Sequence, residues 1–173
     1  ILDRLPEPTP MAPEDLHGLL AEGGIVVDTR SRDRFAQGHI PGTINVPLDN
    51  GFPNWYGWML PYDRPICFIV DDEDQANEAA RDLAFIGIDH SAGYFDAAAL
   101  EYWAANHGPL EMTTVIDWEA AELAMAEEDA FLLDVRKLME WNEGHAPGAT
   151  HIHLGYLRGR SKEVPLDRPV LLY

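Results

Sequence analysis

The sequence predicts an α/β fold in which a parallel β-sheet is flanked by helices on both faces. Short apolar runs rich in β-branched residues alternate with longer stretches whose apolar residues recur at helical spacing. Such alternation favours a parallel sheet, because each crossover places a helix against one face of the sheet. A long stretch of the sequence is also repeated, which predicts one complete copy of the fold and a partial second copy.

The repeat is visible without gaps. IVVDTRSRDRFAQGHIPGTINVPL (25–48) aligns with FLLDVRKLMEWNEGHAPGATHIHL (131–154), an offset of 131 − 25 = 106 residues. Asp-Arg-Pro follows at 63–65 and again at 167–169, an offset of 167 − 63 = 104 residues. A period of this size indicates duplicated domains rather than a solenoid. We therefore predict one domain over 1–110 and the N-terminal part of a second over 111–173.

The elements of each copy follow in order. The first 13 residues hold four prolines and read as a linker or an extended lead-in. A short helix then opens with acidic residues and is stopped by two glycines at 23–24. Later strands are expected at 25–27, 44–46, 66–70 and within 88–94, and helical segments at 31–37, 55–60, 71–87 and 96–106. The second copy is expected to contain a helix at 117–127 and to reach its central strand at 170–173.

The composition excludes several classes of partner. Twelve basic and 30 acidic side chains give a net charge of −18, which argues against nucleic acid and anionic membrane surfaces as partners. No apolar stretch is long enough to span a membrane, and no signal peptide is visible. With Cys67 as the one cysteine, an internal disulfide framework is impossible, so a reducing, cytoplasmic setting is expected. The chain opens at Ile1 rather than Met, which suggests residues upstream.

The repeated segments resemble the rhodanese family. The resemblance rests on VVDTR or LLDVR paired with GHIPGTINVPL or GHAPGATHIHL, and DRPICFIV, DRPVLLY and AGYFDAAALEYW also fit the family pattern. It covers roughly residues 12 to 173. WYGWMLPYDRPI, residues 55–66, further resembles the first of two rhodanese modules that follow a metallo-β-lactamase-fold domain in some bacterial fusion proteins. This resemblance implies that any metal belongs to an N-terminal domain outside this chain. The chain itself is expected to hold no cofactor.

The resemblance implies where a nucleophile should lie. In rhodanese modules a cysteine at the end of the central strand holds sulfur as a persulfide, and backbone N–H groups of the next loop stabilise the anion. It is expected five residues after the proline of Asp-Arg-Pro. That position is Val70 in the first copy, and in the second copy it follows Tyr173. No catalytic residue is therefore expected within this chain, and whether it belongs to an enzyme stays open.

Six charged residues are candidates for shaping the pocket or its loops. The Asp and Arg of each Asp-x-Arg segment have two interpretations. In the structural one they form an ion pair that locks a loop, and in the functional one they shape the ligand pocket. After the central strand, four successive carboxylates oppose binding of thiosulfate, a persulfide anion or phosphate, and they also suit the first turn of a helix. The six candidates are Asp28, Arg30, Asp71, Asp72, Asp134 and Arg136.

The histidines do not predict a metal site. His39 and His145 each precede a Pro-Gly turn and lack a Cys or carboxylate partner at ligand spacing, so hydrogen-bonded turn histidines are expected. His151 and His153 would share one strand face by the period of two, which does not demonstrate a coordination geometry.

The remaining reactive or aromatic side chains favour packing roles. Cys67 lies in the middle of the central strand, where a cysteine is usually an inert apolar residue. Trp55, Tyr56 and Trp58 are expected to serve core or inter-domain packing rather than a ligand cage.

Three functional hypotheses follow. The first is a rhodanese-like segment of a sulfur-metabolism protein that transfers persulfide or thiosulfate sulfur, with an inactive first copy. The second is a non-catalytic docking or dimerisation module attached to a metallo-β-lactamase-fold hydrolase or dioxygenase. A dual-specificity phosphatase would need a longer loop with Cys and Arg, against which the acidic first loop argues. Sulfane-sulfur compounds or a fused catalytic domain are the expected partners, and a homo-oligomer is compatible with the sequence.

Overall fold

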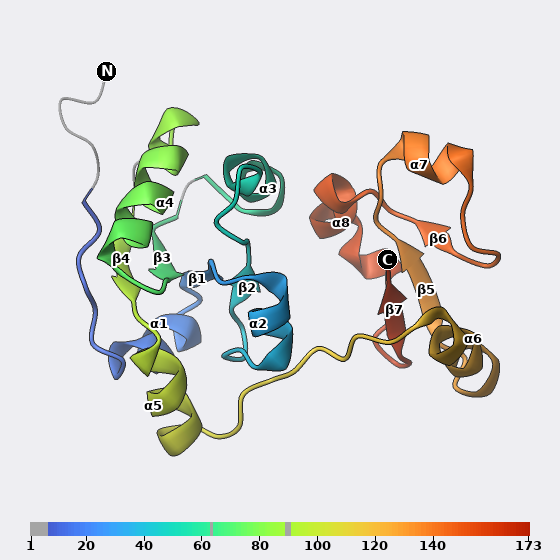
Figure 1. Ribbon diagram of the computed structural model, residues 1–173, viewed down its shortest axis with the longest axis horizontal. Helices are drawn as coiled ribbons and strands as arrows, with labels where there is room; N and C mark the ends of the chain where they lie inside the picture. The colour runs from blue at the N-terminus through green and yellow to red at the C-terminus, as the bar shows by residue number, and fades with distance from the viewer. Residues whose placement is uncertain (1–6, 63, 89–90) are drawn as a thin grey trace. The chain divides into compact units, whose positions relative to one another are not determined.

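The computed structural model describes residues 7–62, 64–88 and 91–173. The chain divides into two compact units, residues 1–114 and residues 115–173, each of which has its own sheet (Figure 1). Asp63 and residues 89–90, where part of a predicted strand and of Asp-Arg-Pro fall, lie outside the described residues.

The first unit alternates strands and helices as predicted. Its sheet has the order β2-β1-β3-β4 with all neighbours parallel. The predicted central strand ends one residue earlier than expected, so Val70 lies just beyond it. The elements are α1 (Asp15–Ala21), β1 (Ile25–Asp28), α2 (Arg32–Gln37), β2 (Ile44–Asn45), α3 (Phe52–Met59), β3 (Ile66–Ile69), α4 (Glu73–Phe85), β4 (Ser91–Phe95) and α5 (Ala98–Asn106).

Local sequence explains where the helices begin. The Ser31 hydroxyl accepts a hydrogen bond from the Arg34 N–H and caps α2, and the Asp72 carboxylate accepts one from the Gln75 N–H and caps α4. These caps satisfy N–H groups that have no partner within the helix. The acidic run after the central strand therefore contributes the capping residue of α4.

The Pro-Gly pair between α2 and β2 forms a tight turn. The Thr43 N–H donates to the Ile40 carbonyl at 3.1 Å, and Gly42 has φ of 87°. A positive φ at this position favours glycine, and proline before it presets its own φ. Gly148 repeats this conformation in the second unit with φ of 82°.

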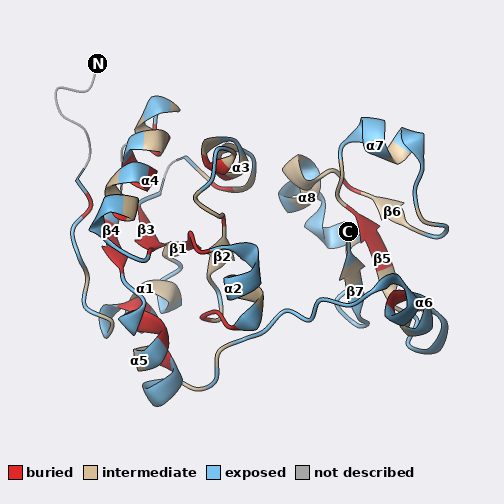
Figure 2. Cartoon of the chain, viewed as in Figure 1, coloured by how far each residue is buried: buried red, intermediate tan, exposed pale blue. Residues whose placement is uncertain are grey.

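Two apolar clusters pack on the sheet of the first unit. One contains Val27, Phe68 and Val70 with residues of α3 and α4, and the other contains Val26, Cys67 and Ile69 with residues of α1 and α5. Because side chains alternate across a strand, these clusters lie on opposite faces of the sheet. Figure 2 shows the buried strands between partly exposed helices. The predicted parallel sheet with helices on both faces is confirmed.

The lead-in adds a further pairing at the edge of the sheet. Pro10 forms a parallel bridge with Tyr94, the Met11 N–H donates to the Tyr94 carbonyl at 2.8 Å, and the Tyr94 N–H donates to the Thr9 carbonyl at 2.9 Å. The described part of the lead-in is thus an extended segment of the fold rather than a linker.

The second unit repeats the first three strands. Its parallel sheet has the order β6-β5-β7. The Val135 N–H donates to the Tyr173 carbonyl at 3.0 Å, as the Thr29 N–H donates to the Ile69 carbonyl at 3.0 Å. The elements are α6 (Trp118–Glu127), β5 (Phe131–Asp134), α7 (Leu138–Glu143), β6 (Thr150–His151), α8 (Leu154–Arg160), the 3-10 helix η1 (Ser161–Glu163) and β7 (Val170–Leu172).

Across the part of the chain that the structure describes, no helix combines the length and apolar character needed to cross a membrane.

Candidate functional site

In the first unit, the predicted site residues gather at the carboxyl ends of the parallel strands. Asp28 ends β1, Asn45 ends β2, and the segment 70–72 connects β3 to α4. Open α/β sheets place their ligands at this edge. The site can therefore be judged from the contacts of these loops.

Asp28 and Arg30 form a closed ion pair beneath the loops. The guanidinium donates from Nε and Nη2 to both carboxylate oxygens, with a shortest distance of 2.6 Å, and the Arg30 N–H also donates to Asp28 Oδ1. Asp28 is fully buried and Arg30 is 8% exposed. The same guanidinium donates to the Gly38 carbonyl at 2.9 Å. The pair thus locks the turn after α2, which is the structural interpretation of Asp-x-Arg.

Asn45 contributes to the site in a way that the sequence motifs do not predict. Its amide nitrogen donates to the carbonyls of Asp28 and Arg30, both at 2.9 Å. These bonds fix the backbone of the Asp-x-Arg segment against β2. The signal that could have found it is its position in the repeat, where His151 takes its place 106 residues later (151 − 45).

The connection between β3 and α4 engages its own backbone groups. Val70 is fully buried, and its N–H donates to the Phe95 carbonyl at 3.0 Å. The Asp71 N–H donates to Gln75 Oε1 at 3.2 Å, and the Gln75 N–H donates to Asp72 Oδ1 at 2.9 Å. These three N–H groups are therefore not directed at a bound anion, as a persulfide cradle would need.

Arg34 partly neutralises the acidic connection, a contact that the sequence pattern does not predict. Its guanidinium Nη1 lies 2.7 Å from Asp71 Oδ2. The hydrogen bond from Arg34 is the main reason why the pKa of Asp71 lies below its ordinary value, against an opposing effect of burial. Asp71 is paired, whereas Asp72 caps the helix, so the two predicted pocket residues have different structural roles.

Removing the Arg34 charge is expected to raise the pKa of Asp71. A folded-state pKa below the unfolded value stabilises the fold above pH about 4, and that contribution is lost as the pH falls through the lower value. A carboxyl-carbon NMR titration of Arg34→Met should show a higher Asp71 midpoint than the parent. Arg32→Met, which alters an exposed cation without a described contact to Asp71, is the control. An unchanged midpoint in Arg34→Met would contradict the assignment.

The second unit repeats the ion pair in a more open setting. Arg136 donates to both oxygens of Asp134, with a shortest distance of 2.6 Å, and to the Gly144 carbonyl at 3.0 Å. Asp134 is fully buried, but the Arg136 side chain is 31% exposed and lies over the Tyr173 ring. Burial acts to raise the pKa of Asp134, and the hydrogen bonds from Arg136 and Tyr173 outweigh it, so the pKa is lowered.

The two turn histidines have equivalent contacts. Nδ1 of His39 lies 2.9 Å from the Phe35 carbonyl and Nδ1 of His145 lies 3.0 Å from the Trp141 carbonyl, so each donates this hydrogen bond. The His39 imidazole also stacks on the Phe35 ring, with ring centroids 3.8 Å apart, and the His145 imidazole stacks on the Trp141 ring, with centroids 3.4 Å apart. They hold the turn, as the sequence favours.

One expectation about the histidines is wrong, and one contact of His39 is not predicted by the sequence. His39 does have a carboxylate neighbour, since Nε2 lies 3.7 Å from Glu111 Oε2. This contact arises because residues after α5 return to form an antiparallel bridge between His39 and Glu111. His151 and His153 do not share a strand face, because β6 ends at His151 and His153 caps α8. Within residues 7–62, 64–88 and 91–173, no three potential metal-ligating side chains cluster.

Cys67 and the aromatic group of α3 are placed by packing. Cys67 is 1% exposed within β3, its Sγ lies 3.5 Å from Met11 Sδ, and burial raises its pKa to about 11. Tyr56 is fully buried in the core, and Trp55 packs partly against it. Trp58 is 45% exposed, so it does not contribute to the core.

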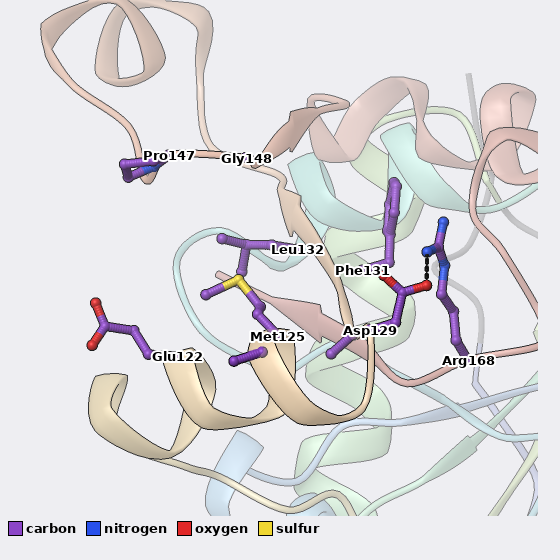
Figure 3. Close-up of a pocket in the computed structure, with 10 residues that line it drawn as sticks. Glu122, Met125, Asp129, Phe131, Leu132, Pro147, Gly148 and Arg168 are labelled. Carbon is purple, nitrogen blue, oxygen red and sulfur yellow. Dashed lines mark hydrogen bonds and ion pairs between the residues drawn. The ribbon is translucent and has the colours of Figure 1, made fainter.

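A cleft of about 530 Å³ lies away from the predicted site, in the second unit (Figure 3). It lies beside α6 and the start of β5, where Arg168 pairs with Asp129 at 2.5 Å. None of the predicted site residues lines it. It is at the amino end of the sheet, opposite the edge where α/β folds bind ligands.

The comparison with protein families identifies the family of this chain. The family model of the rhodanese-like domain matches residues 12–102 and 117–173. The uncharacterized protein BU052 of Buchnera aphidicola is 34% identical over 87 residues, which are 50% of this chain and 59% of that protein. The chain thus spans less than two thirds of the length of this relative.

Two solved structures are also similar. The Alr3790 protein of Anabaena sp. is 25% identical with a TM-score of 0.50, over 60% of this chain and 92% of that one. A metallo-beta-lactamase of Staphylococcus aureus is 33% identical with a TM-score of 0.47, over 56% of this chain and 26% of that one. The fusion to a metallo-β-lactamase-fold domain stays a prediction. With its repeated Asp-x-Arg and Gly-His-x-Pro-Gly segments and a family match to both units, the chain belongs to the rhodanese-like domain family.

Proposed function

We propose that the first unit is a non-catalytic rhodanese-like domain of a protein that transfers sulfane sulfur. The observation that carries this proposal is Val70, a fully buried side chain at the position where a nucleophile is expected. Valine cannot form a persulfide, and the N–H of Val70 is bonded to the Phe95 carbonyl. The first unit then serves to support or orient a catalytic centre elsewhere in the protein.

The acidic connection supports the same proposal. Asp72, Glu73 and Asp74 follow Asp71 directly, and Asp71 is the one that Arg34 pairs. Two like charges about 5 Å apart repel by about 3 kcal/mol at an effective dielectric constant of about 20. A thiosulfate or persulfide anion would meet this repulsion on approaching the end of β3.

In the proposed function, the catalytic centre lies at the end of the central strand of the second unit. Tyr173 occupies the position of Ile69, because their carbonyls accept equivalent hydrogen bonds from Val135 and Thr29. The residue after Tyr173 would therefore be the counterpart of Val70. In the proposed function this residue is a cysteine, and the reducing compartment inferred from the single thiol of this chain keeps it active.

A docking role beside a metallo-β-lactamase-fold hydrolase or dioxygenase is the second candidate. Exposed apolar side chains on the first unit favour it, notably Tyr62 at 51% and Phe85 at 80% exposure. The identity of the residue after Tyr173 in the longer protein discriminates between the two. A cysteine there favours sulfur transfer, and any other residue favours docking.

The 173-residue chain is expected to catalyse no conversion of thiosulfate and cyanide into sulfite and thiocyanate. Colorimetric detection of thiocyanate, with Cys67→Ser measured alongside, checks this expectation. Turnover that survives Cys67→Ser would place a nucleophile elsewhere in the chain, and turnover lost on that substitution would make the buried thiol reactive. Persulfide labelling of a longer protein then tests the second copy.

A further inference from the structure

The chain that follows α5 returns to the turn after α2 before it leads into α6. Figure 1 shows this part of the chain passing beside α2. Glu111 and His39 exchange backbone hydrogen bonds of 2.9 Å in both directions, and the Thr113 N–H donates to the Ala36 carbonyl at 2.9 Å. Residues 110–113 therefore form a returning segment, which these bonds hold on the first unit.

Two side chains add to the backbone bonds of the returning segment. Leu110 packs against the apolar cluster of α1 and α5, and its Cδ1 would lie 3.2 Å from a Cβ added at Gly38. The second contact is electrostatic, because Nε2 of His39 lies 3.7 Å from Glu111 Oε2. Backbone amides and leucine do not titrate near neutral pH, whereas histidine does. Only the contact between His39 and Glu111 can therefore make the hold on this segment depend on pH.

The position of the proton on neutral His39 determines what Nε2 can do. Nδ1 donates to the Phe35 carbonyl at 2.9 Å, so in the neutral ring Nε2 is an acceptor. The ionised carboxylate of Glu111 is also an acceptor, so the contact between them is unfavourable in this state. A second proton on the ring makes Nε2 a cationic donor and turns the same contact into an ion pair. The bond from Nδ1 is kept in both states.

The other groups around His39 leave Glu111 as its counterion. Arg30 donates to the carbonyl of the residue before His39, but Asp28 balances its charge in the buried ion pair. The Phe35 ring stacks on the imidazole, and the face of an aromatic ring attracts a cation. Among the described contacts of the imidazole, Glu111 is the titratable group. The His39 side chain is 10% exposed and that of Glu111 is 64% exposed, so the pair is partly screened by solvent.

We propose that His39 and Glu111 form a pH-sensitive clamp on the returning segment. The attraction between imidazolium and carboxylate is fully present below about pH 6.5, the ordinary value for histidine, and is lost as the pH rises beyond it. The second copy has the same turn histidine, His145, with the same hydrogen bond and ring stacking but without a carboxylate among its described contacts. The clamp thus comes from the returning segment and not from the shared turn.

The clamp sets the length of the connection between the two units. While the returning segment is bound, residues 114–117 lead from it to α6, and when it is released, residues 107–117 lead from α5 to α6. At about 3.5 Å per residue, the longest span of this connection rises from about 17 Å to about 42 Å. Mildly acidic conditions favour the short connection, and alkaline conditions favour the long one.

Hydrogen exchange of the isotope-labelled 173-residue chain, followed by NMR, tests the clamp. The protection factors of the Glu111 and Thr113 amides, which correct for the intrinsic effect of pH, are compared at pH 5.5 and pH 7.5 at constant ionic strength. We expect them to be about two- to fivefold larger at pH 5.5, the scale of an ion pair with an exposed partner. The Val70 amide, which donates to the Phe95 carbonyl, reports the stability of the whole unit. Equal protection at both pH values, or a change that Val70 shares, would overturn the proposal.

Two variants separate the clamp from the other contacts. Glu111→Gln removes the charge, keeps the length of the side chain and is expected to abolish the pH dependence of the Thr113 protection. Leu110→Ala removes the apolar contact, so it should lower the protection at both pH values and keep the ratio between them. A pH dependence that persists in Glu111→Gln, or that disappears in Leu110→Ala, would refute the role of the ion pair. Because no sulfur transfer is measured, the result is independent of the proposed function.

Discussion

Replacing Asp28 by alanine is expected to lower the free energy of unfolding of the first unit by about 3 to 5 kcal/mol. The substitution removes both acceptors of a guanidinium that is 8% exposed, and it leaves a charge in the protein interior without its partner. The remaining bond to the Gly38 carbonyl does not compensate the charge. Urea unfolding followed through NMR signals of each unit separately measures the loss.

Asp134→Ala is the matched control for this prediction. It removes the equivalent carboxylate, but the Arg136 side chain is 31% exposed and can be solvated once its partner is gone. We expect a smaller loss, roughly half as large, in the second unit. The double variant Asp28→Ala, Arg30→Met should recover much of the stability, because an apolar side chain replaces the unpaired charge. Equal losses in the two single variants would mean that burial of the arginine does not determine the cost.

The sequence predicted the local and repeated features because each depends on neighbouring residues. Asp28 and Arg30 are two positions apart, so their contact follows from the loop that they share. The turn at Gly42 follows from the Pro-Gly pair, and the caps follow from Ser31 and Asp72. The repeat then transferred the interpretation to the second copy, where Asp134 and Arg136 make the same bonds.

The features that the sequence did not predict depend on contacts between distant segments. Arg34 reaches Asp71 across 37 positions, and Glu111 reaches His39 only because the chain returns after α5. The period of two places His153 on a strand because it does not show where a strand ends, whereas the structure ends β6 at His151. Tertiary packing decides such contacts, and pairwise patterns in one sequence carry no information on them.

The pairing of the lead-in with β4 is a further long-range contact, and it places Met11 against the thiol of Cys67. Gly93 is decisive, because a Cβ at this residue would lie 2.6 Å from the Thr9 carbonyl oxygen and 2.7 Å from Met11 Cγ. The obstacle includes backbone, so Gly93→Ala is expected to displace residues 9–11. The two hydrogen bonds with Tyr94 and the packing of Met11 would be lost, which corresponds to about 2 to 3 kcal/mol.

Displacement of the lead-in should expose Cys67, whose Sγ lies against Met11 Sδ in the parent. In the intact fold, burial and a pKa of about 11 leave almost no thiolate at neutral pH, so alkylation is slow. A local opening made easier by 1.4 kcal/mol or more raises the reactive population about tenfold. Alkylation by iodoacetamide, quantified by intact mass over time, should therefore be at least about tenfold faster in Gly93→Ala than in the parent.

Gly18→Ala provides the control of opposite sign. Gly18 lies within α1 with nothing near its Cβ position, so alanine should stabilise the helix by about 0.5 to 1 kcal/mol and leave the alkylation rate unchanged. If Gly93→Ala were alkylated as slowly as the parent, Met11 could not be the cover of Cys67. Faster alkylation without any gain of sulfur-transfer activity would show that packing protects the thiol from alkylation. It would also show that the position of Cys67 within β3, rather than its burial, keeps it out of catalysis.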